Sequence, residues 1–332
     1  MARKHGSLAI AASLSLAFSA CCTSSPDVGR GVEIRSPNAW AEQTISLDLE
    51  LEDRDRDREV PIRIYLPTEP GGPLPLVFVS HGIGESRASY EWLGRAIASN
   101  GYTVIHPTHR GTDRSVLEEG WLAMYRATQE RENWRNRVLD ISFILDELPE
   151  IEAAESRLEG AFDPDRVGVV GHSAGAWTAA AIAGLELASG ESLSDPRIDA
   201  IAPLSMPRTG SIEGPEAWAS LRGPVLHMTG TCDTQLIWRT FPRHRRIPWE
   251  YGEEEDQYLL TLEGGRHTTF SEPWDRSDTV QSILQLLVAE SVSAFLDAYV
   301  AGDAERRTEL RNGAFREIGN GSMKVEQRPD GN

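Results

Sequence analysis

The sequence is poor in cysteine and in basic charge. Only three of the 332 residues are cysteine, which excludes a small domain stabilised by a disulfide framework. Lys and Arg number 33 against 51 Asp and Glu, so the formal net charge is -18. Affinity for nucleic acid depends on neutralising phosphates with Lys and Arg, and we therefore expect no nucleic-acid partner. There is no internal repeat, and beyond the N-terminal segment no apolar run is long enough to span a membrane.

The first twenty residues have the features of an export signal. Arg3 and Lys4 give a positive start, and the run Leu8–Ala20 is apolar but short for a membrane span. The small residues before Cys21 resemble a bacterial lipoprotein signal, in which that cysteine is lipidated. Ordinary cleavage after Ala20 is the alternative.

These features predict an exported bacterial protein with a signal peptide over residues 1–20. Residues 21–38 are rich in Ser, Pro and Gly and are expected to form a tether. If Cys21 is acylated, the protein is held at a membrane on the periplasmic or outer-membrane side; if not, it is secreted.

Two hydrophobic patterns predict the fold. Alternating apolar residues in Thr44–Leu51 and Val60–Leu66 indicate an antiparallel hairpin with a charged turn. Short continuous apolar runs are typical of buried parallel strands, and they occur at Leu76–Val79, Thr103–Ile105, Val167–Val170, Ile198–Leu204, Val225–Met228 and Tyr258–Leu262. Segments of helical period lie between them, at Tyr90–Ser99, Trp134–Leu148, Ala174–Ala188 and Val280–Val300.

This alternation predicts an α/β fold with a mostly parallel sheet of about eight strands, an antiparallel N-terminal hairpin and helices on both faces. We expect one folded domain over residues 39–301, no large lid, and a polar C-terminal tail over residues 302–332.

A nucleophile motif stands between a predicted strand and a predicted helix. Residues 171–175 read Gly-His-Ser-Ala-Gly, with Ser173 at the centre. A tight strand-to-helix turn needs glycine at both flanks, and it exposes the serine hydroxyl at the helix N-terminus. The alternative is a Gly-rich packing turn with an inert serine.

A serine nucleophile needs a histidine base and an acid later in the chain. Asp233 and His267 each follow a predicted parallel strand, which places both at its carboxyl end. Asp195 and Asp199 compete as acids but precede a strand. Other histidines compete with His267, namely His106, His109, His172, His227 and His244.

Two backbone N–H groups are expected to bind the oxyanion that forms at the carbonyl. Ala174 follows the serine, and Ile83 lies in the loop Ser80-His81-Gly82-Ile83-Gly84 after the first parallel strand. A structural Gly-rich turn is the alternative for this loop.

These motifs together resemble the α/β-hydrolase superfamily, in particular the bacterial branch similar to platelet-activating-factor acetylhydrolase and to dienelactone hydrolase. The matching stretches are Ser80-His81-Gly82, residues 101–111, Asp163–Ser173, Thr229–Asp233 and Gly264–His267. The resemblance implies a catalytic triad of Ser173, Asp233 and His267, with oxyanion donors at Ile83 and Ala174. True dienelactone hydrolases use a cysteine nucleophile, whereas position 173 is serine.

The resemblance implies a serine hydrolase that cleaves carboxylic esters through an acyl-enzyme intermediate. Alternatives are an acyltransferase or a peptidase with the same triad, or an exported lipoprotein that is a non-catalytic binding module. No cofactor and no metal are expected, and the substrate would be a small-molecule or polymeric ester. Trp121, Met206 and Trp238 are candidate walls of the substrate site. Cys232 is expected to be a small buried residue without a disulfide.

Overall fold

The computed structural model describes residues 37–208, 214–253, 256–271, 273, 275 and 277–328. The predicted signal peptide and Cys21 lie outside the described residues. Helix α1 (Pro37–Gln43) begins two residues before the expected start of the domain at residue 39. It leads directly into the first strand.

The domain is built on one twisted sheet of nine strands in the order β1-β2-β4-β3-β5-β6-β7-β8-β9. The strands are β1 (Thr44–Asp53), β2 (Arg58–Pro67), β3 (Leu74–Ser80), β4 (Thr103–Pro107), β5 (Phe162–His172), β6 (Ala200–Leu204), β7 (Val225–Cys232), β8 (Gln257–Arg266) and β9 (Met323–Arg328). Strands β4, β3, β5, β6, β7 and β8 pair in parallel, whereas β1, β2 and β9 pair antiparallel at the two ends. This arrangement confirms the predicted fold class and adds a ninth strand.

The strand patterns follow from burial. From Ser46 to Glu52, β1 alternates exposed residues with buried or half-buried ones, because one of its faces meets solvent. β3 is buried along nearly its whole length, since helices cover both faces of the central sheet. Continuous apolar runs and alternating runs therefore mark the middle and the edge of the same sheet.

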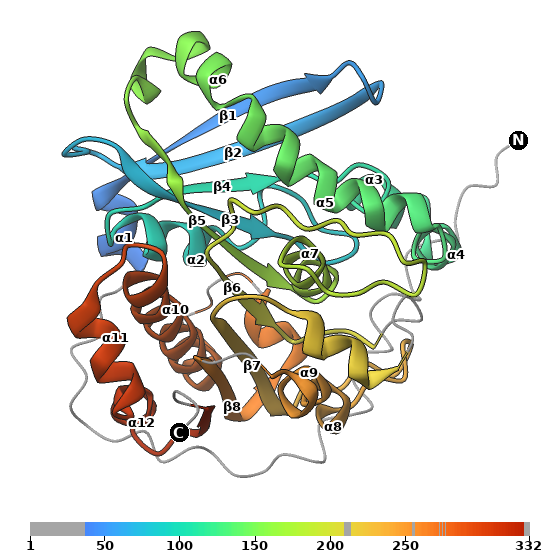
Figure 1. Cartoon of the computed structure of the whole chain (residues 1–332), viewed down its shortest axis with the longest axis vertical. Coiled ribbons are helices and arrows are strands. Elements are labelled where there is room, and N and C mark those ends of the chain that lie inside the picture. Colours follow the sequence, from blue (N-terminus) through green and yellow to red (C-terminus); the bar gives the residue numbers. More distant parts are fainter. Residues whose placement is uncertain are drawn as a thin grey trace, which may run out of the picture.

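Helices cover both faces of the sheet (Figure 1). One face carries α1, α2 (Glu91–Ala98), α10 (Thr279–Tyr299), α11 (Ala304–Arg311) and α12 (Ala314–Gly319). The other carries α5 (Arg131–Asp146), α6 (Leu148–Ala154) and α7 (Ala174–Ile182). Shorter helices lie in the connections: α3 (Arg114–Glu118), α4 (Trp121–Ala127), α8 (Pro242–Arg245), α9 (Ile247–Tyr251), η1 (Ser156–Leu158), η2 (Pro215–Ser220) and η3 (His267–Phe270).

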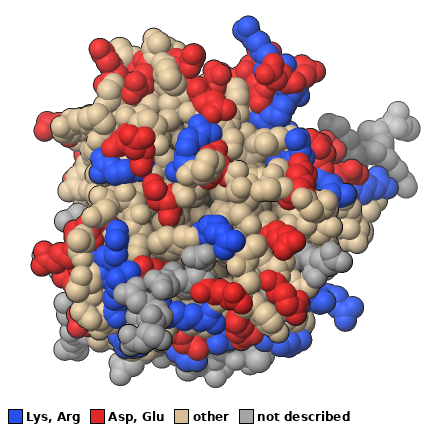
Figure 2. Space-filling model, viewed as in Figure 1, with Lys and Arg blue, Asp and Glu red and all other residues tan. Residues whose placement is uncertain are grey.

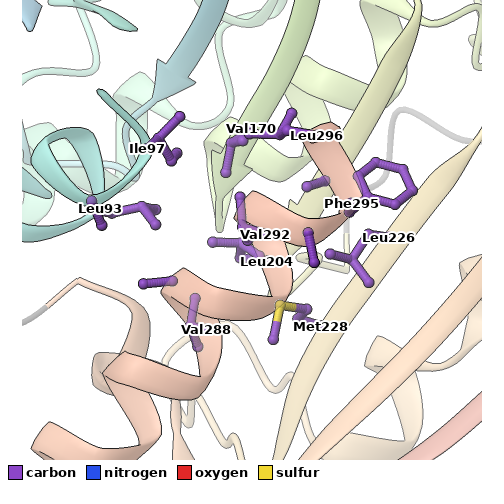
Figure 3. Close-up of a cluster of buried hydrophobic side chains, with 14 of the residues drawn as sticks. Leu93, Ile97, Val170, Leu204, Leu226, Met228, Val288, Val292, Phe295 and Leu296 are labelled. Atoms are coloured by element: carbon purple, nitrogen blue, oxygen red, sulfur yellow. The ribbon is translucent and has the colours of Figure 1, made fainter. Parts of the chain in front are cut away.

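Helix α10 is the centre of one hydrophobic core. Figure 3 shows Val288, Val292 and Phe295 of this helix among side chains from α2, β5, β6 and β7. By length and composition α10 could cross a membrane, but 72% of its most apolar window is buried inside the domain. The helix is therefore a core element, and its apolar character is explained by packing.

The C-terminal segment corrects the expectation of a polar tail. Residues 304–328 form α11, α12 and β9, and β9 extends the sheet beside β8. Leu310 and Phe315 are fully buried against the α10 core, and Asp303 caps α11 by accepting backbone N–H groups. A few apolar side chains anchor this segment to the core. They are too few to produce a periodic pattern, so the sequence of this polar stretch did not indicate helices or a strand.

Positive charge at the surface comes almost entirely from arginine, because the chain has lysine only at Lys4 and Lys324. Figure 2 shows acidic and basic side chains intermixed over one face of the molecule. Many of the arginines pair with carboxylates; Arg63, for example, donates two hydrogen bonds to Asp48. Exposed pairs of this kind contribute little to stability.

Candidate active site

Ser173 lies in a strained turn between β5 and α7. Its backbone has φ 55° and ψ -115°, a conformation that non-glycine residues rarely adopt. A Cβ at Gly171 would overlap the carbonyl of Gly175, and a Cβ at Gly175 would overlap the carbonyl of Ser80. Both glycines are therefore required for the turn, which places Ser173 at the N-terminus of α7 and its positive dipole end.

Gly175→Ala is expected to destabilise the domain by about 3 kcal/mol, because the new methyl group meets backbone atoms that cannot rotate away. The matched control is Gly71→Ala, since a Cβ at Gly71 has no atom within 4 Å. Denaturant unfolding of both variants measures the difference. Equal stability of the two would contradict the close approach of α7 to β3.

Asp233 and His267 lie together at the carboxyl edge of the sheet. Asp233 directly follows β7, and His267 directly follows the neighbouring parallel strand β8. His267 Nδ1 is 3.1 Å from Asp233 Oδ1, and Thr229 Oγ1 donates to Asp233 Oδ2 at 2.9 Å. A bond from Nδ1–H to the carboxylate leaves Nε2 of His267 as the basic nitrogen.

Burial and charge oppose each other at this pair. Burial alone would raise the pKa of Asp233, but the hydrogen bond from His267 and the charge of Arg245 outweigh it and lower the pKa to about 2. Burial lowers the pKa of His267, and Asp233 only partly offsets this. At neutral pH the pair therefore consists of an ionised carboxylate and a neutral imidazole.

His267 also packs against the residue that precedes Ser173. The rings of His172 and His267 lie 4.5 Å apart, centroid to centroid. The structure thus brings Ser173, Asp233 and His267 to one edge of the sheet, although their catalytic roles stay predictions.

The competing residues lie elsewhere. Asp195 pairs with Arg197, and Asp199 accepts the backbone N–H of Val167 at the start of the parallel run of β5. Of the other competing histidines, His106, His109 and His227 are buried, and His244 accepts the backbone N–H of Phe241 at the start of α8.

The loop that carries Ile83 lies close to Ser173. A Cβ at Gly82 would be 3.5 Å from that of Ser173, and Ile83 and Ala174 both line the cavity that Ser173 faces. The N–H of Gly82 donates to Glu85 Oε2 at 2.8 Å and to the Tyr90 hydroxyl at 3.1 Å. These bonds fix the loop whose backbone is expected to bind the oxyanion.

A buried arginine donates hydrogen bonds that hold the loop carrying Ile83 in place. Arg137 of α5 is fully buried and donates to the carbonyl of His81 and to Thr112 Oγ1. Its neighbour Ser80 bonds His109 Nε2 at 3.0 Å, and His109 Nδ1 is 2.9 Å from Asp140. Sequence reasoning missed this network, because Arg137 and Asp140 have the spacing of ordinary polar residues on a helix.

The cavity beside Ser173 has a volume of about 980 Å³. Trp177 and Trp238 contribute aromatic surface, and polar side chains including Arg135 and Glu191 line another part. Trp177 is buried against Trp134, so it both packs α7 and lines the cavity. A wall with apolar and polar parts suits a substrate with a polar group next to an apolar one.

The candidate wall residues have different outcomes. Trp238 lines the cavity and stacks on Tyr125 at 5.8 Å. Met206 is buried in the core that α7 also packs against, and it lies outside the lining. Trp121 is 71% exposed on α4 and also lies outside it. An apolar residue after a strand can face either the core or a cavity, and its sequence position does not distinguish them.

Cys232 corrects one expectation. It is disulfide-bonded rather than a reduced buried residue, so its thiol cannot take part in the chemistry next to Asp233. Among the described residues, no three His, Cys, Asp or Glu side chains gather closely enough to hold a metal ion.

The sequence is similar to those of known proteins. Residues 76–309, more than half of the chain, match the alpha/beta hydrolase family. The platelet-activating factor acetylhydrolase of Cavia porcellus is 29% identical over 148 residues, which cover 36% of this chain and 34% of that protein. The match thus spans about a third of the length of that relative. The chain belongs to the alpha/beta hydrolase family.

Proposed function

We propose that the protein hydrolyses carboxylic esters, with Ser173 as nucleophile, His267 as base and Asp233 as the acid that orients the base. The observation that carries this proposal is the pairing of His267 Nδ1 with a buried Asp233 at 3.1 Å, next to a serine in a strained turn at a helix N-terminus. A serine hydroxyl is a weak nucleophile without such a base.

The reaction has two acyl-transfer steps. His267 Nε2 takes the proton of Ser173 as Oγ attacks the ester carbonyl, and the N–H groups of Ile83 and Ala174 bind the oxyanion. The proton then passes to the leaving alcohol as the ester C–O bond breaks. Water, deprotonated by His267, attacks the acyl-enzyme and releases the acid and the serine hydroxyl.

The cavity and the relative support an ester substrate. The relative is an acetylhydrolase by name. In this chain, Ser173 and Ala174 share the cavity with the aromatic side chains of Trp177 and Trp238. An apolar wall beside the nucleophile favours an uncharged acyl group, and the polar lining could hold a polar alcohol part.

The location of the enzyme is part of the same proposal. Export and a lipid anchor at Cys21 rest on the sequence pattern of residues 1–21, which lie outside the described residues. An anchored hydrolase would act on esters outside the cytoplasm.

A fluorophosphonate probe tests the proposal, because it reacts with serines that a base has activated. We expect one labelled peptide, with the label on Ser173, and no labelling of the His267→Ala variant. Unchanged thermal unfolding of that variant serves as the control for folding. Product analysis of short-chain ester turnover by the protein without the probe distinguishes hydrolysis from acyl transfer to added amine or alcohol. A folded protein that takes no label at Ser173 would overturn the proposal and favour a binding module.

A further inference from the structure

A buried arginine lies against the Asp233–His267 pair. Arg245 is the last residue of α8, and both its side chain and that of Asp233 are fully buried. Its Nη2 is 3.1 Å from Asp233 Oδ1 and 3.2 Å from His267 Nδ1. A conventional triad needs only the carboxylate and the imidazole, so this cation is an addition to the arrangement.

The guanidinium is held rigidly in this position. Its Nη1 donates to the carbonyls of Ser205 and Met206 at 2.9 and 2.6 Å, and its Nη2 also donates to Gln235 Oε1 at 3.1 Å. Arginine cannot lose its proton at any pH where the enzyme is folded, so a permanent charge lies here. Because its backbone partners follow β6, the charge is fixed relative to the sheet.

Arg245 and His267 approach the same oxygen of Asp233. The carboxylate accepts from Thr229 at its other oxygen, so it is surrounded by donors and stays ionised. The imidazole Nδ1 is also 2.6 Å from Ser205 Oγ. Three neighbours therefore contact Nδ1: a carboxylate, a hydroxyl and a cation.

Two charged side chains, Asp233 and Arg245, lie next to the His267 ring. Asp233 is negative and Arg245 is positive, and both contact Nδ1 while they pair with each other. His172 stacks on the ring, and burial lowers its pKa well below the usual value, so it is neutral. Behind His172, the Tyr90 hydroxyl bonds its Nδ1 at 2.8 Å and contacts Glu85, whose pKa is raised by burial.

We infer that Arg245 is a positioning residue for the reaction: it fixes Asp233 beside His267 and, by its charge, opposes protonation of the imidazole, which extends activity to lower pH. This inference rests on the proposed function of His267 as the base. A positive charge about 3 Å from an imidazole favours the neutral form, and the neutral form is the one that can take the serine proton.

The test compares the pH dependence of kcat/KM in the full chain and in three variants. Arg245→Gln removes the charge, Arg245→Lys keeps it, and Arg243→Gln on the same helix removes an exposed charge that lies over the Phe241 ring. We expect the acid limb of Arg245→Gln to move up by about 1 pH unit. Arg245→Lys and Arg243→Gln should keep the limb of the natural protein. An acid limb that stays in place, or moves down, in Arg245→Gln would overturn the inference.

A second measurement reports on Arg245 without turnover. Burial already lowers the pKa of His267, so NMR titration of the His267 ring is compared between Ser173→Ala and Ser173→Ala/Arg245→Gln. The midpoint should be about 1 pH unit higher in the chain without the charge, and Ser173→Ala/Arg245→Lys should keep the midpoint of Ser173→Ala. An equal or lower midpoint in Ser173→Ala/Arg245→Gln contradicts the inference. If the natural protein neither turns over esters nor takes the probe, the proposed function fails, whereas this titration still reports on Arg245.

Discussion

Ser173→Ala is expected to lower kcat/KM for an ester by about 10⁴- to 10⁶-fold. The variant has no oxygen that can form the acyl-enzyme, so His267 has no nucleophile to activate. The loss should fall on kcat, because the cavity wall and the oxyanion donors are unchanged. Steady-state kinetics with a short-chain chromogenic ester measures both parameters. Activity that remains comes from the oxyanion hole and from binding.

Stability should not change with this substitution. Ser173 already has a positive φ of 55°, and alanine has the same Cβ, so the strain of the turn is the same in both chains. Ser192→Ala, which removes an exposed hydroxyl that bonds Ser194 Oγ, is the matched control and should keep full activity. Retention of more than a tenth of the activity in Ser173→Ala would rule out Ser173 as the nucleophile.

The fold could be predicted from the sequence wherever burial leaves a pattern. Leu76–Val79 lies inside β3 and Val225–Met228 inside β7, because strands covered on both faces must be apolar throughout. Helix α10 was predicted to within a residue at each end, since it presents apolar residues over many turns. Short helices such as α3 and α8 leave no such pattern, as a single turn is too brief to show a period.

The residues of the candidate site also fall into two groups, those that the sequence could predict and those that it could not. Ser173, Asp233 and His267 could be proposed because each follows a strand, and parallel strands end at one edge of the sheet. Arg245 and Arg137 could not, because a sequence shows that a residue is charged but not that tertiary structure has buried it beside partners. The groups that tune and support the predicted triad are therefore the ones that required the structure.

Asp233→Asn tests both the catalytic role of Asp233 and its buried ion pair with Arg245. An amide can donate to His267 Nδ1, which would place the ring proton on Nε2 and leave no base for the serine. We expect kcat/KM to fall by about 10⁴-fold. The same change removes the negative partner of Arg245 at 3.1 Å, so a buried cation loses its counter-charge and the free energy of unfolding should fall by about 3–5 kcal/mol. Denaturant unfolding and steady-state kinetics measure the two losses separately.

The double variant Asp233→Asn/Arg245→Gln separates the two effects. It removes both charges, so most of the lost stability should return, whereas activity should stay low because the amide still sets the wrong tautomer. Asp199→Asn is the control: this carboxylate accepts the Val167 N–H away from the site, and the amide oxygen can accept the same bond. It should cost at most about 1 kcal/mol and no activity. If Asp233→Asn were as stable as the natural protein, the Arg245–Asp233 pair would not be the buried ion pair described above; if it were as active, Asp233 would not orient the base.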